Sequence, residues 1–393
     1  MNRGWWSGNR YGGCRKKTSW LAAGLAPERF HPIRSLAISD KESRMKRNEK
    51  YELLKSANDL SALLGMKAYT LQDGRAKGLR AIDIKNGKGL ELTVLPDRGM
   101  DIPFLSYRGV NLGFVSKAGL AGPEFYTEDG DYGFLKNFTG GFLTNCGITY
   151  AGPSFEEQGR AYGLHGPLSN IPAEYVNKEL AYEGEDAVLR VSGSMRQARV
   201  FGENVYLHRS MTIETEANVI RFADTIENCG FEEQPVMNLY HFNFGYPMLD
   251  AGAKAYFSTD TVIPRTPFAA QEIDRHQLMI APEVGREEQC YFHSGGAGGQ
   301  FAMLHNEKMG LAVVIHYNPA QCPVLCEWKC MRAGDYALGL EPTTSGVQSR
   351  PEAREKGELQ YVGPGETLQV DLRVEVLDDP SEISQYIALS GIK

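Results

Sequence analysis

The stretch LQVDLRVEV, residues 368–376, alternates apolar and polar side chains at every position. Side chains of an extended strand point to opposite faces in turn, so this pattern puts the leucines and valines on one face and the polar residues on the other. The turn-forming segment GPGE, residues 363–366, lies one residue before it. The stretch therefore predicts a β-strand with one buried face.

Segments of the same character lie upstream of this strand. Residues 205–215 and 219–228 keep their apolar side chains in phase and are joined by the short connection EAN, which predicts a β-hairpin. Residues 187–195 and 311–319 predict further strands. With 43 glycines and no alternation of strands with helices, the chain is expected to fold as a mostly β antiparallel sandwich or barrel.

Helical spacing is scarce by comparison. Residues 49–66 carry leucines and alanines at near-helical intervals, which predicts one helix near the start of the patterned region. A shorter helix is expected at residues 379–391, where Asp379 or Ser381 is the candidate N-cap.

The domain organisation follows from where patterning begins. Regular patterning starts near Met45, and no linker divides the chain after it, so residues 45–393 are predicted to form a single large β domain with a short helical preface. Residues 1–44 are predicted to be a poorly ordered extension. Because basic residues precede the short apolar run WLAAGLA, a targeting segment is the competing interpretation of that extension.

Charge and composition exclude some classes of partner. The formal net charge of −7 argues against a nucleic-acid partner. No run of 18 apolar residues is present, so no membrane span is expected. The seven cysteines are odd in number and match no disulfide framework, which favours reduced thiols and a cytoplasmic location. Oligomeric state cannot be read from these features.

Three of the cysteines, Cys322, Cys326 and Cys330, recur at every fourth residue. In a strand this spacing would place the three sulfurs on one face. Zinc sites usually combine a close cysteine pair with a second pair of ligands, and no second pair accompanies this cluster. We therefore interpret the three residues as buried thiols and not as a metal site.

Three ionisable residues stand beside small or aromatic ones. His165 lies in the loop GLHGP, whose glycines allow close approach of backbone or ligand. His241 shares a strand face with Asn243, whereas the neighbouring aromatic residues face the other side. Glu341 ends an apolar strand beside Ala337 and Gly339, which leave a hollow next to the carboxylate. Each residue also has a structural interpretation: a loop histidine bonded to a carbonyl, a satisfied buried histidine, and a glutamate facing water.

Taken together, two imidazoles and one carboxylate suit proton transfer at a polar small molecule. They also suit a His/His/Glu metal site, and the residues alone do not decide between the two.

The order of these motifs resembles the aldose 1-epimerase (galactose mutarotase-like) superfamily. Members carry a Leu-His-Gly loop, a later strand with histidine and asparagine, and a late glutamate after an apolar pair, which correspond here to LHG, HFNFG and GLE. The segments FTGGFLTNCG and VVIHYNP also look like segments of hexose-6-phosphate mutarotase relatives. LPDRGMDI and GLHG resemble most an uncharacterised branch described as an aldose epimerase-like domain of unknown function. The resemblance covers residues 65–377.

The resemblance implies a β-supersandwich with a sugar-binding cleft. It implies that Glu341 is the base that deprotonates the anomeric hydroxyl, that His241 is the acid that protonates the ring oxygen, and that His165 positions the sugar. The ring opens and closes again on the other face, with no cofactor and no metal. Residues that motif position suggests for sugar contact are Arg98, Asn243, Tyr317, Arg160 and Trp328. Arg160 is the candidate substitute for an arginine that the family usually has before the first histidine.

The expected partner is a neutral or mildly acidic monosaccharide or sugar derivative. A phosphorylated sugar would need a basic cluster, to which Lys136, Arg160 and Arg98 could contribute. Alternatives on the same fold are epimerisation at another carbon, a lyase, a hydrolase with Glu327 as a second carboxylate, and a sugar binder without catalysis.

Overall fold

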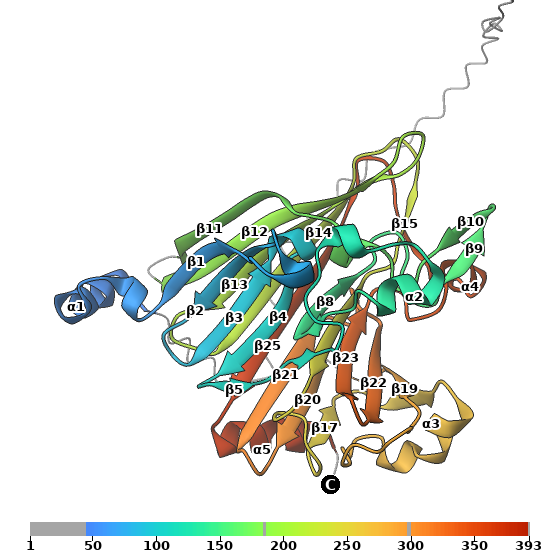
Figure 1. Cartoon of the computed structure of the whole chain (residues 1–393). Helices are drawn as coiled ribbons and strands as arrows, with labels where there is room; N and C mark the ends of the chain where they lie inside the picture. Colours follow the sequence, from blue (N-terminus) through green and yellow to red (C-terminus); the bar gives the residue numbers. More distant parts are fainter. Residues whose placement is uncertain (1–44, 184–185, 297–299, 392–393) are drawn as a thin grey trace, which may run out of the picture. The chain divides into compact units, whose positions relative to one another are not determined.

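The computed structural model describes residues 45–183, 186–296 and 300–391. The predicted extension, residues 1–44, lies outside the described residues. From residue 45 onward the chain is mostly β, as the alternating segments predict, and two large antiparallel sheets carry most of it (Figure 1). That residues 45–393 form one domain stays a prediction.

The first sheet has 11 strands. In spatial order they are β1 (Gly65–Thr70), β2 (Arg80–Lys85), β3 (Leu90–Leu95), β4 (Asp101–Tyr107), β8 (Leu143–Cys146), β16 (Leu239–Phe244), β23 (Asp335–Thr343), β22 (Val324–Arg332), β19 (Gln289–Ser294) and β18 (Thr261–Pro264), with β5 (Val110–Asn111) paired to β4.

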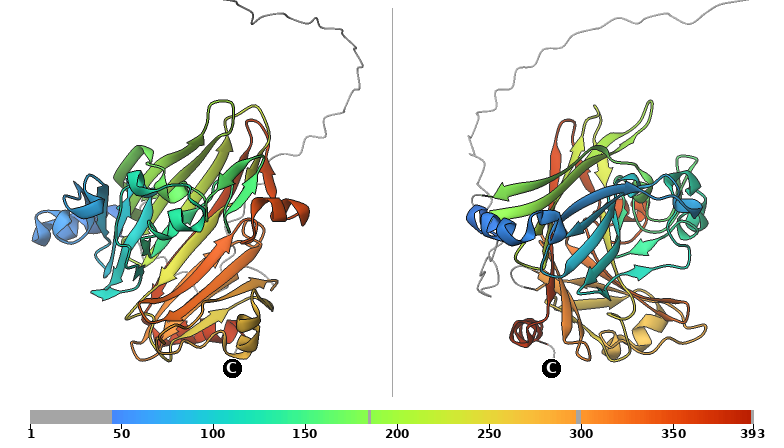
Figure 2. Two further views of the ribbon diagram at one scale, coloured as in Figure 1. Left: turned by 45° about the vertical axis from the view of Figure 1, so that its right-hand side comes forward. Right: turned by 60° about the vertical axis from the view of Figure 1, so that its left-hand side comes forward.

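The second sheet has 8 strands. In spatial order they are β11 (Glu174–Glu183), β12 (Asp186–Ala198), β13 (Asn204–Glu214), β14 (Val219–Asn228), β25 (Thr367–Leu377), β21 (Leu311–Tyr317), β20 (Gln300–Asn306) and β17 (Lys254–Phe257). Figure 2 shows the strands of both sheets from two further sides.

Shorter elements connect these strands. The helices are α1 (Arg47–Ala57), α2 (Gly130–Leu135), α3 (Pro267–Gln271), α4 (Arg350–Glu355) and α5 (Pro380–Leu389). Three two-stranded sheets pair β6 (Phe114–Val115) with β7 (Gly140–Gly141), β9 (Phe155–Glu157) with β10 (Arg160–Tyr162), and β15 (Gln234–Val236) with β24 (Gln360–Val362). Among the described residues, no helix is both long and apolar enough to cross a membrane.

The apolar faces of the two large sheets meet in one core. Phe222 of β14 and Phe242 of β16 come from different sheets, and their ring centroids are 5.9 Å apart. The alternating stretch that predicts a strand is the centre of β25, whose buried residues Val370, Leu372 and Val374 belong to this core. Burial of such side chains is the dominant favourable contribution to folding.

A buried ion pair and its hydrogen bonds link the two sheets behind the strand that carries His241. Arg209 of β13 donates to Asp224 of β14, and both side chains are fully buried. Arg209 also donates to the side-chain oxygen of Asn145 on β8, and the hydroxyl of Tyr240 on β16 donates to Asp224. Removing one partner of such a pair typically costs about 3–5 kcal/mol, so this network anchors β16 firmly.

Most local predictions are confirmed. Strands β13 and β14 pair as a hairpin, with Ile213 opposite Ile220. Helix α5 forms at the expected place, and its N-cap Asp379 accepts hydrogen bonds from the backbone of the next turn.

The predicted helix at residues 49–66 is wrong in its second half. Helix α1 ends at Ala57, and Asn58 adopts a left-handed φ of 59° that the helix cannot continue. The later leucines belong to a short 3₁₀ turn, Leu60–Ala62, which leads into β1.

The prediction that three thiols share one strand face holds for two of them. Cys326 and Cys330 lie on the same face of β22. Cys322 precedes the strand and is buried in the core between the two sheets. The periodicity of a strand cannot place a residue that lies outside it.

Candidate active site

Adjacent strands at the middle of the 11-stranded sheet bring two of the predicted residues together. Strands β16 and β23 are antiparallel, with Leu239 opposite Thr343 and Phe242 opposite Leu340. This register places His241 opposite Glu341. The aromatic neighbours of His241 on β16 face the core between the sheets, as the alternation predicts, so the imidazole and the carboxylate project from the other face.

The imidazole and the carboxylate are in contact. His241 Nδ1 lies 3.2 Å from Glu341 Oε1, and the two side chains are only 6% and 3% exposed. Neither atom has a hydrogen-bond partner with good geometry in the protein. Buried polar atoms are normally paired, so an unpaired set in a pocket is typical of a site that receives a ligand.

His165 reaches the same place from a loop. Its φ of 59° is left-handed, which is uncommon for a residue with a side chain. Backbone hydrogen bonds hold this conformation: the N–H of His165 donates to Gly152, and its carbonyl accepts from Gly147, at 2.8 and 2.9 Å. The imidazole rings of His165 and His241 are 5.7 Å apart, nearly perpendicular, and Nδ1 of His165 also has no partner.

The predicted hollow beside Glu341 is present and is used by Glu341 itself. A Cβ atom at Gly339 would lie 2.1 Å from Glu341 Oε1. The carboxylate therefore folds back over a position where no side chain fits. Glycine at 339 allows Glu341 to adopt the orientation that meets His241.

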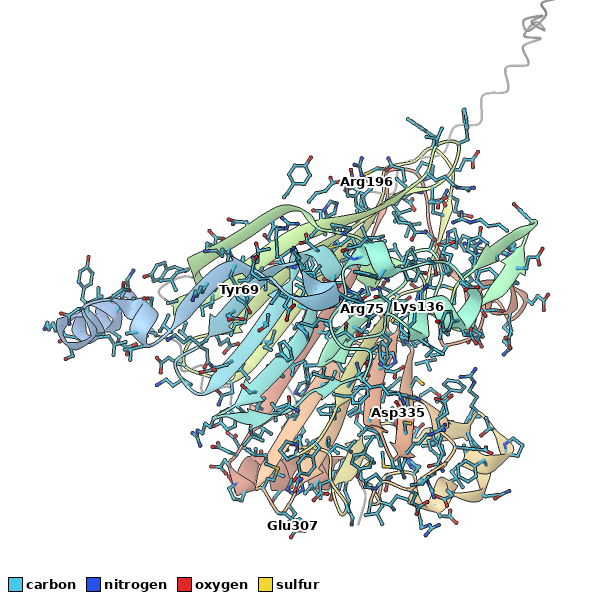
Figure 3. All side chains as sticks on the ribbon, in the orientation of Figure 1. Tyr69, Arg75, Lys136, Arg196, Glu307 and Asp335 are labelled. Atoms are coloured by element: carbon cyan, nitrogen blue, oxygen red, sulfur yellow. The ribbon has the colours of Figure 1, made fainter. Side chains whose placement is uncertain are left out.

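The three residues line one pocket with a volume of about 580 Å³. Its apolar walls include Phe134, Phe138 and Trp328, whose rings contact the imidazoles at centroid distances of 5.0–5.5 Å. Figure 3 labels Asp335, which also lines this pocket at the start of β23. An aromatic wall with a few polar groups is typical of a site for a small polar ligand.

Burial decides the charge states of the three groups. It lowers the pKa of His241 to about 3 and that of His165 to about 4; proximity to His165 further lowers the pKa of His241, and the charge of Arg265 further lowers that of His165. Burial also raises the pKa of Glu341 well above its usual value. At neutral pH both imidazoles of the ligand-free pocket are therefore neutral, and burial favours the neutral form of the Glu341 carboxyl group. The acid role that the resemblance implies for His241 needs a protonated imidazole, and desolvation opposes that form in the ligand-free pocket.

These pKa shifts predict acid sensitivity. Between pH 6.5 and about 4, His165 is protonated in the unfolded chain but not in the folded chain. The free energy of unfolding therefore falls by about 1.4 kcal/mol for each unit by which the pH is lowered. Above pH 6.5 this contribution does not change with pH. We expect the His165→Gln variant to lose roughly 2 kcal/mol less stability than the wild type from pH 7 to pH 5, measured by urea denaturation. Equal losses in both proteins would show that His165 protonates freely in the folded state.

Of the residues predicted to contact sugar, the pocket receives Trp328 and not the other four. Arg98 is buried elsewhere and donates to Asn170, to Ser169 and to backbone carbonyls. Asn243 donates to the carbonyl of His241 instead of pointing into the pocket.

Tyr317 and Arg160 also lie away from the pocket lining. Tyr317 is in the core between the sheets, and Arg160 pairs with Glu128 at 3.3 Å. Position near a motif does not determine which way a side chain points, and this is why these predictions do not match the structure. Lys136 donates to Thr127, and none of the three suggested phosphate-binding residues, Lys136, Arg160 and Arg98, lines the pocket.

The pocket also contains charged and sulfur-bearing residues that the sequence reasoning missed as part of the site. They are Lys117, Asp131, Arg265, Arg286, Cys290 and Glu288, together with Arg332 and the thiols of β22. Several of them come from loops without periodicity, so no pattern in the sequence indicates that they meet.

The suggested second carboxylate, Glu327, lies outside this pocket. Glu327 lies between pocket residues of β22, so its side chain points to the opposite face of the strand. There it is fully buried and accepts hydrogen bonds from His276 and His293 at 2.7 and 3.1 Å. The proposed hydrolase pair of Glu327 and Glu341 is therefore not formed. Among the described residues, these same three side chains are also the group close enough to share a metal ion, and His165, His241 and Glu341 are not.

Known structures share this fold. A protein from Klebsiella pneumoniae, provisionally named an aldose 1-epimerase, matches with a TM-score of 0.76 at 24% identity, over 84% of this chain and 86% of that one. A galactose mutarotase-like protein from Clostridium acetobutylicum matches with a TM-score of 0.58 at 15% identity, over 81% and 100%. Slr1438 from Synechocystis sp. PCC 6803 matches with a TM-score of 0.56 at 15% identity, over 76% of this chain and 95% of that one. The curated proteins contain no match.

The two large antiparallel sheets and these neighbours define a galactose mutarotase-like fold, as the motif order predicts. Residues 76–376 match the family described as Domain of unknown function (DUF4432). The chain belongs to that family.

Proposed function

We propose that this protein interconverts the anomers of a monosaccharide by opening and closing the sugar ring, with His241 and Glu341 as the acid–base pair. The observation that supports this most directly is the contact of 3.2 Å between His241 Nδ1 and Glu341 Oε1 in an aromatic-lined pocket. Both atoms are buried and lack a well-aligned partner, so both are free to bond to a ligand. The names of structural neighbours, an aldose 1-epimerase and a galactose mutarotase-like protein, refer to the same chemistry, but they describe those proteins and not this chain.

Ring opening needs one proton removed from the anomeric hydroxyl and one proton added to the ring oxygen. In this mechanism the pair shares one transferable proton, and burial favours its place on Glu341 because it raises the pKa of Glu341 and lowers that of His241. Glu341 then donates its proton to the ring oxygen while His241 Nδ1 accepts the anomeric proton. After rotation about the bond between C1 and C2, the transfers reverse and the ring closes on the other face.

These starting roles are the reverse of those that the family resemblance implies. The roles that the resemblance implies, with Glu341 as base and His241 as acid, require the proton to move first from Glu341 to His241, whose atoms are 3.2 Å apart. Sugar hydroxyls bonded to the carboxylate would favour that transfer, because hydrogen bonds stabilise the charged form. Both routes use the same two atoms and leave the pair unchanged after one turnover.

The remaining groups would hold the sugar in place. Neutral His165 offers Nδ1, which has no protein partner, to a sugar hydroxyl. Trp328 and Phe138 offer flat apolar surface to the less polar face of the ring. The chemistry needs no cofactor, because side chains of the chain make both proton transfers.

The proposal is tested by NMR measurement of anomer exchange over a panel of free sugars, with and without the protein. We expect at least one sugar to exchange faster than in protein-free buffer. Sugar binding without faster exchange over the whole panel would instead identify a sugar binder and contradict the proposed catalysis.

A further inference from the structure

The cations that line the pocket differ in whether they are paired. Lys117 pairs with Asp335 at 2.8 Å, and Arg286 pairs with Glu272 and Glu283 at 2.6 and 2.8 Å. Arg265 and Arg332 also line the pocket, and neither makes an ion pair with any described residue. Two guanidinium groups at this pocket therefore have no acidic partner.

The acidic groups of the pocket contact partners other than Arg265 and Arg332. Glu288 accepts a hydrogen bond from the indole of Trp328 at 2.7 Å, and Asp131 accepts one from Ser154 at 2.6 Å. Asp335 pairs with Lys117, and burial raises the pKa of Glu341 and so favours its neutral form. The pocket lining holds four cationic and four carboxyl side chains, so what distinguishes it is the presence of two guanidinium groups that make no ion pair with any described residue.

Arg265 lies at the end of a row of residues that crosses the sheet toward Glu341. Gly339 of β23 is opposite Trp328 of β22, and Trp328 is opposite Cys290 of β19. Arg265 directly follows β18, and its backbone N–H donates to the carbonyl of Cys290. The indole and the thiol therefore form a shelf between the catalytic pair and the guanidinium.

The charge of Arg265 acts on the catalytic groups across this shelf. It is one of the causes that lower the pKa of His165, and it opposes the rise in the pKa of Glu341. A ligand that lies on the shelf with its reacting carbon at Glu341 would extend toward Arg265.

Building on the proposed function, we propose that the sugar substrate carries an anionic group, a carboxylate, sulfonate or phosphate, which pairs with Arg265. A guanidinium group presents two parallel N–H donors that match such oxyanions, and it stays charged at any physiological pH. Arg332, at the end of β22, adds positive charge along the same rim. The competing role for Arg265 is hydrogen bonding to neutral hydroxyl groups, which would not discriminate between charged and neutral sugars.

Matched sugars separate these roles. D-Glucuronate and D-glucose 6-phosphate test the carboxylate and phosphate forms against D-glucose, and D-galacturonate is compared with D-galactose. We expect calorimetry on the full chain to show at least about tenfold tighter binding of one anionic sugar than of its neutral counterpart. Added salt should weaken the binding of the anionic sugar more than that of the neutral one.

Substitution of the arginine assigns the effect to its position. We expect Arg265→Gln to lower affinity for the anionic sugar about tenfold and to reduce the preference over the neutral sugar. The control is Arg196→Gln on β12, an exposed arginine labelled in Figure 3 that pairs with Glu174. This control should keep the full preference for the anionic sugar.

Equal affinity of the wild type for charged and neutral sugars would overturn this inference. An Arg265→Gln substitution that lowers the affinity for both sugars equally would overturn it as well. Calorimetry does not depend on turnover. Tight binding of an anionic sugar without anomer exchange would therefore support the charge partner and contradict only the proposed catalysis. Faster anomer exchange of neutral sugars, without tighter binding of any anionic sugar, would support the proposed catalysis and contradict only the charge partner.

Discussion

Replacing Glu341 by glutamine is expected to reduce catalysed anomer exchange by about 10² to 10⁴, down to the rate in water. The amide has nearly the same shape as the carboxyl group but cannot give or take a proton. Because burial raises the pKa of Glu341 and favours its neutral form, a neutral amide at this position should change the thermal midpoint little. Exchange is measured by NMR with the sugar that the wild type turns over fastest.

The control for this variant is Glu307→Gln, which changes an exposed glutamate in the turn between β20 and β21 (Figure 3). This control should exchange sugar at the wild-type rate. If Glu341→Gln kept that rate as well, the proton would have to travel through another group, and the acid–base pair proposed here would be wrong.

Replacing Gly339 by alanine should reduce exchange nearly as much, by about 10²-fold or more, although residue 339 does no chemistry. The new methyl group would lie 2.1 Å from Glu341 Oε1, so the carboxyl group must turn away. A carboxyl group at the end of a flexible side chain turns easily, and the fold should stay intact. A displacement of about 1 Å in a reacting group is enough to cost 10² in rate.

Thermal unfolding and NMR exchange measured on the same samples distinguish displacement from unfolding. Ala337→Gly is the matched control, since it removes a methyl group two residues earlier on the same face of β23. It should cost stability, because glycine weakens a strand interior, but leave exchange close to the wild-type rate. Normal exchange in Gly339→Ala would mean that the carboxyl group works from a different position.

The fold could be predicted where one face of a strand is buried. Alternation in residues 368–376 and in the two segments of the β13–β14 hairpin reports burial directly, so these strands were located from the sequence. The end of α1 could not be located, because the leucines after Ala57 continue the helical spacing while the backbone turns away at Asn58. Apolar spacing records which side chains are buried and not which backbone conformation buries them.

The contact between the two residues of the proposed catalytic pair was predictable for a similar reason. Small residues beside Glu341 and aromatic residues flanking His241 show in the sequence which side of each strand stays open. Arg98 has no such signal: its side chain is bonded to backbone carbonyls and to two polar side chains, a role that depends on distant segments. Arg265 was missed because it follows a short strand, β18, with weak alternation.

His241 and Glu341 stand on interior strands, whereas Arg265 follows β18, the last strand at one edge of the sheet. Mutations on the interior strands disturb neighbours on both sides, but mutations at the rim disturb few. We expect descendants of a common ancestor to have kept the reacting pair and to have diverged at the edge strand and its loops. Sugar specificity would then change quickly in evolution, whereas the proposed proton-transfer reaction would hardly change.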